Sequence, residues 1–99
     1  MKQVPFTQFH LPDGTPEQVF TEVPDELAPK VDAILQAGFT FACEVLTNGW
    51  CSFTIGDDHG DYANEICTNG LAVPIHVQKM IKNFDISAAR LKSSQMGGV

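Results

Sequence analysis

The fold is decided by the stretch FTFACEVLTNGWCSFTIG, residues 39–56. Two strand-like runs, Phe39–Leu46 and Trp50–Ile55, flank the segment Thr47-Asn48-Gly49. Runs rich in aromatic and β-branched residues on either side of a short Asn-Gly segment are typical of a β-hairpin. The length of the connecting loop then decides which side chains share a face of the sheet.

The register of this hairpin follows from burial. A two-residue Asn48-Gly49 turn would pair Cys43 with Thr54 and leave both faces mixed. A three-residue loop with Gly49 as the bulge residue makes one face wholly apolar, through the pairs Val45/Cys51, Cys43/Phe53 and Phe41/Ile55. The other face then carries Leu46/Trp50, Glu44/Ser52 and Ala42/Thr54. Because a one-residue slip exchanges the faces, burial predicts the three-residue loop and a positive φ at Gly49.

Residues 4–22 predict a second hairpin, with a loop formed by Pro12-Asp13-Gly14. Proline presets φ at the first corner of a turn, and glycine accepts the left-handed position. A three-residue loop places Phe6 opposite Phe20 as an aromatic cross-strand pair. Since Pro5 has no N–H for a ladder, we expect the first arm at an edge of the sheet.

Residues 25–37 predict the first helix, because one apolar face is formed by Leu27, Val31, Ile34 and Leu35. Asp25 is placed to cap this helix. Pro29 is awkward inside the first turn, so a tight turn over residues 25–28 followed by a helix from Pro29 is an equal alternative. Gly38 is the expected left-handed stop, after which Phe39 folds back on Ile34.

The second half of the chain continues with strand and helix patterns. Residues 56–61, GDDHGD, predict a polar loop, and Tyr62–Thr68 a third strand that Asn69-Gly70 closes. Pro74 opens a second helix with one apolar stripe of Val73, Val77, Met80, Ile81 and Phe84. Residues 87–94 predict a short helix or a frayed tail.

The expected order of elements is therefore ββ-α-βββ-α. This order predicts a two-layer α+β domain, in which an antiparallel sheet of an N-terminal hairpin and a three-stranded meander packs on two helices. At 99 residues the chain is long enough for one domain, which we expect to span residues 1–86, with residues 87–99 as the short helix or tail.

The charges are unevenly distributed along the chain. The net charge is −6, yet residues 1–75 hold eleven acids and two lysines, and residues 76–99 hold four cations against Asp85. An acidic body repels phosphates and argues against direct nucleic-acid binding. The sequence has no apolar run long enough to span a bilayer and no apolar segment typical of a secretory signal, so we expect a cytoplasmic protein that does not enter membranes.

The side chains that could act as nucleophiles or metal ligands match no catalytic or cofactor motif. The three cysteines form no CxxC pair, and we expect core thiols rather than a zinc site or a catalytic thiolate. Nucleotide-binding glycine motifs are absent, and we expect no cofactor and no enzyme activity. The loop around His59, with Asp57, Asp58 and Asp61, is either a solvated acidic loop or a weak site for a divalent ion.

The polar face of the central hairpin is the candidate functional surface. Leu46 and Trp50 form an apolar pair at its tip, bordered by Glu44, and tryptophan is enriched at interface hot spots. Either this pair is exposed or the N-terminal hairpin or the C-terminal segment covers it. The expected partner-binding set is Leu46, Trp50 and the carboxylates Glu44, Asp57, Asp58, Asp61 and Glu65. Such a set would bind a protein with a basic surface.

Four short segments resemble the short accessory proteins of bacteriophages and mobile elements: AGF at residues 37–39, EVLTNG at residues 44–49, TI at residues 54–55 and EICTNGLAVP at residues 65–74. Some of these proteins are anti-CRISPR or other anti-defence inhibitors. The resemblance implies a small acidic inhibitor that blocks the basic nucleic-acid channel of a host complex. The alternative is a self-associating module that forms a homodimer through its outer sheet face or an edge strand.

Overall fold

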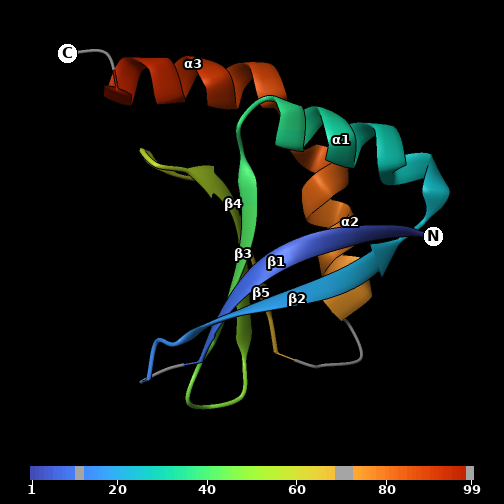
Figure 1. The fold of residues 1–99 in the computed structure, drawn as a ribbon, viewed down its shortest axis with the longest axis vertical. Coiled ribbons are helices and arrows are strands. Elements are labelled where there is room, and N and C mark those ends of the chain that lie inside the picture. Colours follow the sequence, from blue (N-terminus) through green and yellow to red (C-terminus); the bar gives the residue numbers. More distant parts are fainter. Residues whose placement is uncertain (11–12, 69–72, 98–99) are drawn as a thin grey trace.

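The computed structural model describes residues 1–10, 13–68 and 73–97. Its elements follow the order ββ-α-βββ-αα, which confirms the α+β class (Figure 1). The strands are β1 (Lys2–His10), β2 (Pro16–Val23), β3 (Thr40–Val45), β4 (Cys51–Asp57) and β5 (Gly60–Cys67). The helices are the 3₁₀ turn η1 (Asp25–Leu27), α1 (Ala28–Gln36), α2 (Val73–Asn83) and α3 (Ile86–Gly97).

The core lies between one face of the sheet and the helices. The five strands form one sheet in the order β2-β1-β3-β4-β5. One face, called the inner face, carries the buried strand residues Val4, Phe6, Val23, Phe41, Cys43, Phe53, Ile55 and Cys67. These residues form one cluster with Val31 and Ile34 of α1, Val77, Met80 and Ile81 of α2, and Ala89 of α3. Every described helix therefore packs on the inner face, and the opposite, outer face stays open.

The sheet contains one parallel pair, where the sequence predicted an antiparallel sheet throughout. β1 pairs with β3 in parallel over Thr7–His10, and the other neighbours are antiparallel. A parallel pair needs a long crossover connection. Here β2, η1 and α1 form that connection, which carries the chain from the end of β1 back to the start of β3.

The central hairpin has the predicted register. Cys43 lies opposite Phe53 and Val45 opposite Cys51, and Gly49 has a φ of +84°. Leu46 N–H donates to the Trp50 carbonyl at 2.8 Å, which closes the three-residue loop. Burial of the apolar face therefore selects the register, as the sequence predicted.

The predicted register of the N-terminal hairpin is wrong by one residue. Phe6 lies opposite Val19, and Phe20 lies opposite Pro5. In this register β1 turns Val4 and Phe6 toward the helices together with Val19 and Val23 of β2, whereas Phe20 points outward. Pairing Phe6 with Phe20 would have turned Phe20 toward the helices, together with the polar residues two positions before and two positions after it. Burial therefore decides this register too. Part of the predicted loop, at Pro12, lies outside the described residues.

β1 is also an interior strand, not the predicted edge strand. It lies between β2 and β3, and β2 is the edge. The ladder between β1 and β3 begins only at Thr7, so Pro5 lies outside it and pairs with β2 alone. A proline is tolerated in an interior strand where the neighbouring ladder has not yet begun.

The first helix follows the alternative with a separate tight turn. η1 is followed by α1, and Pro29 lies in the first turn of α1. Asp25 makes no capping bond, and its carboxylate instead pairs with the N-terminal ammonium at 2.9 Å. The helix ends at Gln36, and Gly38 has the expected left-handed conformation, with a φ of +94°. Phe39 N–H donates to the Ile34 carbonyl at 3.3 Å and Gly38 N–H to the Leu35 carbonyl at 3.0 Å, which is a Schellman motif.

Residues 56–61 are mostly strand rather than the predicted loop. β4 and β5 continue through this segment and are joined at Asp58 and His59. The register shifts beside Gly56, where Asp61 and Ala63 oppose consecutive residues of β4 and leave Tyr62 as a bulge residue. A bulge turns a side chain toward the other face, so the Tyr62 ring meets the buried Phe39 ring at 5.6 Å.

The predicted stripe of the second helix is confirmed for the buried residues Val77, Met80, Ile81 and Phe84. Residues 87–94 belong to α3, which extends over Ile86–Gly97 where the sequence left a short helix or a tail open. Asp85 caps α3, since Ala88 N–H donates to its carboxylate at 3.0 Å. The predicted turn at Asn69-Gly70 lies outside the described residues. Within the described residues, no helix combines the length and apolar character needed to cross a bilayer.

Candidate functional site

Two rows of side chains cross the outer face of the sheet. The first row is Gln18, Thr7, Ala42, Thr54 and Asn64, and the second is Pro16, Phe9, Glu44, Ser52 and Ile66. The rows are mostly polar, but two large apolar side chains stand exposed on this face, Phe20 at 59% and Ile66 at 51%. An open sheet face with exposed aromatic and aliphatic residues is typical of an interaction surface.

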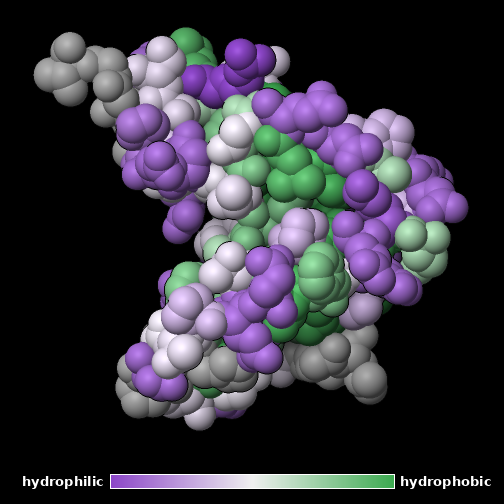
Figure 2. Space-filling view, viewed as in Figure 1, coloured by the Kyte–Doolittle hydropathy of each residue, from purple (hydrophilic) through white to green (hydrophobic). Residues whose placement is uncertain are grey.

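The outer face is also hollowed. In Figure 1, α1 and α2 lie on one side of β3 and β4. On the opposite side, the molecular surface is indented between the β4–β5 turn and the ends of the other two hairpins (Figure 2). The open face therefore offers a concave surface rather than a flat one.

Trp50 lies at the end of the central hairpin, directly before Cys51 of β4. It follows Gly49 in the loop between β3 and β4, and 43% of the residue is exposed. Its backbone N–H donates to Asn48 Oδ1 at 3.0 Å, which holds the loop closed. Leu46, across the loop, is half-buried. Within the described residues neither the N-terminal hairpin nor α3 covers Trp50 completely.

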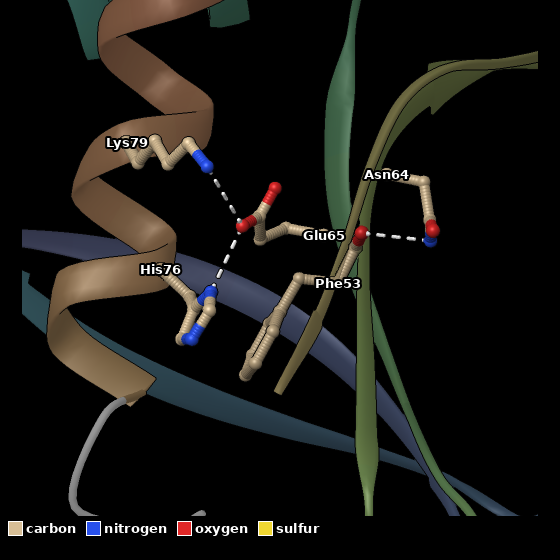
Figure 3. A network of polar contacts seen from close by, with 5 residues as sticks. All are labelled: Phe53, Asn64, Glu65, His76 and Lys79. Carbon is tan, nitrogen blue, oxygen red and sulfur yellow. Dashed lines mark hydrogen bonds and ion pairs between the residues drawn. The ribbon is translucent and has the colours of Figure 1, made fainter. Parts of the chain in front are cut away.

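Glu65 does not belong to this face, which corrects the expectation of one shared surface. It lies opposite Phe53, on the inner side of β5, whereas its neighbour Asn64 points to the outer side (Figure 3). The Glu65 carboxylate lies 2.9 Å from His76 Nδ1 and 3.6 Å from Lys79 Nζ, both on α2. The hydrogen bond from His76, followed by the charge of Lys79, lowers the pKa of Glu65. Glu65 thus holds α2 against the sheet.

Asp57 also turns toward the helices. Its carboxylate accepts hydrogen bonds from Ser93 Oγ of α3 at 2.5 Å, from Tyr62 Oη at 2.9 Å and from the His59 N–H at 2.9 Å. The Ser93 bond, with the other two donors, lowers the pKa of Asp57. Side-chain alternation along β4 places Asp57 on the same face as Phe53 and Ile55, so it attaches α3 to the sheet instead of facing a partner.

The remaining predicted residues are exposed but not adjacent. Asp58 and Asp61 lie at the β4–β5 turn, and Glu44 lies in the middle of the outer face. Phe20, Ile66 and Glu22 also lie on the outer face, although they were not among the predicted surface residues. In the correct register, the alternation of side chains along the N-terminal hairpin would have placed Phe20 and Glu22 on the outer face. Ile66 could be placed there only once the pairing of β5 with β4, in which Ile66 lies opposite Ser52, was known.

The structure separates the charges into two layers. All six cations lie in or against the helix layer: Lys30 in α1, Lys79 and Lys82 in α2, Arg90 and Lys92 in α3, and Lys2, whose Nζ lies 2.9 Å from Asp32 of α1. Six of the twelve acids share that layer: Asp25, Glu26, Asp32, Asp57, Glu65 and Asp85. The other six lie on the outer face or at the strand ends: Asp13, Glu17, Glu22, Glu44, Asp58 and Asp61. The net charge of −6 therefore belongs to the sheet side.

The helix side contains a hollow of about 290 Å³ between β5, α2 and α3. Its apolar wall includes Met80, Phe84 and Ala89, and its rim includes Glu65, Lys79, Asp85 and Lys92. Glu65 and Asp85 are used to hold α2 and to cap α3, so this rim consists largely of groups already engaged in the fold. The described residues contain no group of three potential metal ligands, and in the Asp57–Asp61 segment only Asp58 and His59 form the turn between β4 and β5.

The predicted core thiols lie on the inner face. Cys43 and Cys67 are buried, and Cys51 is half-buried. Burial raises the pKa of Cys43 to about 12, and the neighbouring Cys51 adds to this shift. A thiol with this pKa stays protonated at neutral pH and is a poor nucleophile.

Comparison with known proteins adds no relative to this description. No family model matches the chain, and no match was found among curated proteins or among solved structures.

Proposed function

We propose that the chain is a small acidic, non-enzymatic protein-binding module whose outer sheet face docks on a basic surface of another protein. One observation carries this proposal: among the residues that the structure describes, the outer face holds no lysine or arginine, while it presents Glu22 and Glu44 beside exposed apolar side chains. A face of one charge sign with apolar anchors is complementary to a cationic surface.

The two parts of the surface have different roles in binding. The carboxylates accelerate association with a cationic partner and set specificity, because long-range attraction acts before contact. Trp50, Ile66 and Phe20 become desolvated in the complex and slow its dissociation, as aromatic and aliphatic anchors do at interface hot spots. Asp57 and Glu65 are left out of this surface, because their carboxylates bond to α3 and α2.

The resemblance to phage accessory proteins extends the proposal to an inhibitor. A basic surface that binds nucleic acid is the target that an acidic module competes for, and an anti-CRISPR-like inhibitor blocks such a surface in a host defence complex. This role places the protein in the cytoplasm of the host cell, with no direct contact to nucleic acid.

The test compares two charge reversals of equal size. Glu44→Lys changes the outer face, and Glu26→Lys changes the helix layer at an exposed position. Immobilised wild type and both variants are incubated with a bacterial lysate at low and high salt, and the retained proteins are identified. We expect the same protein to be retained by the wild type and by Glu26→Lys, with roughly tenfold less on Glu44→Lys and less at high salt. Equal retention by all three proteins refutes the electrostatic contact.

The second candidate function is self-association through β5. This strand ends the sheet, and among the described residues no strand pairs with its other side. An unpaired edge strand is a template for pairing with a second copy. Light scattering after size exclusion separates the two functions, because a monomer of 10.8 kDa favours a foreign partner and twice that mass favours the homodimer.

A further inference from the structure

The hollow on the helix side lies along the free edge of the sheet. Among the described residues no strand pairs with the free edge of β5. The hollow of about 290 Å³ is lined by residues of β5, α2 and α3, and Asn64 and Glu65 are both among them. These two side chains point to opposite faces of the sheet (Figure 3), so a hollow that reaches both runs along the backbone edge between them. It is therefore a groove, called the edge groove, between β5 and the two helices.

The directions of the backbone groups follow from the central hairpin. Leu46 N–H donates to the Trp50 carbonyl, so the backbone groups of Trp50 face β3. Successive residues of a strand direct their N–H and C=O groups to alternate sides, so those of Phe53 face β5. The Phe53 carbonyl accordingly accepts a hydrogen bond from Asn64 Nδ2 of β5 at 3.1 Å.

Two residues of β5 direct their backbone groups out of the free edge. Glu65 lies opposite Phe53, so its N–H and C=O face β4. Those of its neighbours Asn64 and Ile66 therefore face away from β4. The Asn64 side chain leaves the edge open, because its Nδ2 also donates to Ser52 Oγ of β4, at 2.8 Å. An extended peptide is the ligand whose own backbone matches such a row of donors and acceptors.

The walls of the edge groove indicate which side chains this peptide carries. Met80, Phe84 and Ala89 line the hollow, so it accepts an apolar side chain. Lys92 stands exposed at the rim, and no carboxylate of the described residues lies within ion-pair distance of it. The two carboxylates of the rim are already bound within the fold. The unpaired charge is thus a cation, which is complementary to an acidic residue of the ligand.

We propose that the edge groove binds an extended, acidic peptide segment of a partner protein, which adds to β5 as a further strand. The peptide backbone bonds to the outward N–H and C=O groups of Asn64 and Ile66. One apolar side chain enters the hollow, and an aspartate or glutamate reaches Lys92. This site is separate from the proposed function, because it uses the edge of β5 and an acidic partner instead of the outer face and a basic one.

A second copy of the chain fits this groove less well. The acid on the inner side of β5, Glu65, already bonds to His76 and Lys79 of its own helix. Pairing of two β5 edges would therefore bring no free carboxylate from that side to Lys92. Both occupants use the same edge, so the experiment must tell them apart.

The probe is a library of random dodecapeptides displayed on phage and selected against the immobilised full chain. We expect the enriched sequences to place an apolar residue and an aspartate or glutamate an even number of positions apart, because alternate residues of a strand share a face. One enriched sequence is then synthesised with a fluorescent label, and its dissociation constant for the chain is measured by anisotropy.

Two pairs of variants test the contacts. Asn64→Pro removes an N–H of the free edge and leaves the bonds to β4, and Asn64→Ala loses the same side chain but keeps that N–H. We expect roughly tenfold weaker binding to Asn64→Pro than to Asn64→Ala. Lys92→Glu should weaken binding about threefold. Lys82→Glu is its control, since Lys82 is exposed on α2 and does not line the edge groove.

Amide hydrogen exchange of the wild type decides the proposal even where a variant folds poorly. On saturation with the peptide, the amides of Asn64 and Ile66 should exchange at least about tenfold more slowly. The proposal is overturned if no peptide is enriched, if Asn64→Pro and Asn64→Ala bind equally, or if protection appears only on the outer face. A dimer in which the Asn64 amide is protected before peptide is added would assign the edge to a second copy and would overturn it too.

Discussion

His76 Nδ1 lies 2.9 Å from Glu65 Oε1, and this contact joins the first turns of α2 to the inner side of the edge strand β5. The lowered pKa of Glu65 keeps it ionised at neutral pH, so the carboxylate accepts and the Nδ1 of His76 carries the hydrogen. A residue that the sequence assigned to a binding surface is thus part of the contact between the two layers.

This contact predicts a loss of stability in acid. The pKa of Glu65 in the folded protein lies below its ordinary value of 4.5, so its contribution to the free energy of unfolding is present above that value. The contribution is lost as the pH falls through the lowered, folded-state pKa. Urea denaturation of the wild type between neutral pH and pH ~3 should show a steeper decline than that of Glu65→Gln, which has no carboxyl group to titrate. If the stability of both proteins declined equally with falling pH, Glu65 would not be a cause of the loss of stability in acid.

We expect replacement by alanine to have different effects at two adjacent serines, because only the Ser93 hydroxyl is shown to bond to Asp57. Ser93→Ala removes a hydrogen bond to Asp57 and should raise the pKa of Asp57 toward its ordinary value. It should also speed amide hydrogen exchange in α3. Ser94→Ala is the control, since Ser94 is exposed. NMR titration of Asp57 checks the prediction, and identical titration curves for the two variants would contradict it.

The register of the N-terminal hairpin predicts opposite outcomes for two phenylalanines. Phe6 is buried, with its ring centroid 5.4 Å from that of Phe41 and 5.6 Å from that of Phe53. Phe6→Ala should lower the free energy of unfolding by about 3–5 kcal/mol. Phe20→Ala, on the open face, should change it by no more than about 0.5 kcal/mol. Chemical denaturation of both variants measures this difference, and similar costs would indicate the Phe6–Phe20 register instead.

Gly56 predicts a steric cost at the bulge. A Cβ at this position would lie 2.4 Å from the Gly60 carbonyl oxygen and 2.9 Å from the Asp61 Cα, both backbone atoms. Gly56→Ala should therefore destabilise the protein by about 1–3 kcal/mol. Gly49→Ala is the comparison, because a Cβ there meets nothing and only the positive φ is strained, at about 1 kcal/mol. Thermal unfolding measures this cost. If Gly56→Ala unfolded with the same midpoint temperature as the wild type, β4 and β5 would be able to move apart at the bulge, and the prediction would be wrong.

Sequence reasoning succeeded where one short segment contains all the necessary information. The register at Cys43 and Phe53, the stop at Gly38 and the stripe on α2 depend on neighbouring residues and on periodicity. It failed for the N-terminal hairpin because turn residues were given more weight than the burial of faces. If the register at Phe6 and Phe20 had been chosen by which face is apolar, as in the central hairpin, the predicted register would have been the observed one.

The candidate surface was only partly predictable. Glu44, Leu46 and Trp50 were placed by the alternation of one hairpin, which the sequence determines. The inward orientation of Glu65 and Asp57 depends on how β5 pairs with β4 and on where α2 and α3 pack. No local pattern contains these contacts, because they join segments far apart in the chain.

By itself, the sequence determined the kinds of element, their order and the faces of the central hairpin, because propensity and periodicity act over a few neighbouring residues. The tertiary structure decided the parallel pairing of β1 with β3, the use of Glu65 and Asp57 as supports for helices, and the gathering of all cations in the helix layer. These features depend on which distant segments bury their apolar faces together. A short stretch of sequence specifies which of its faces is apolar, but not which other segment will cover it.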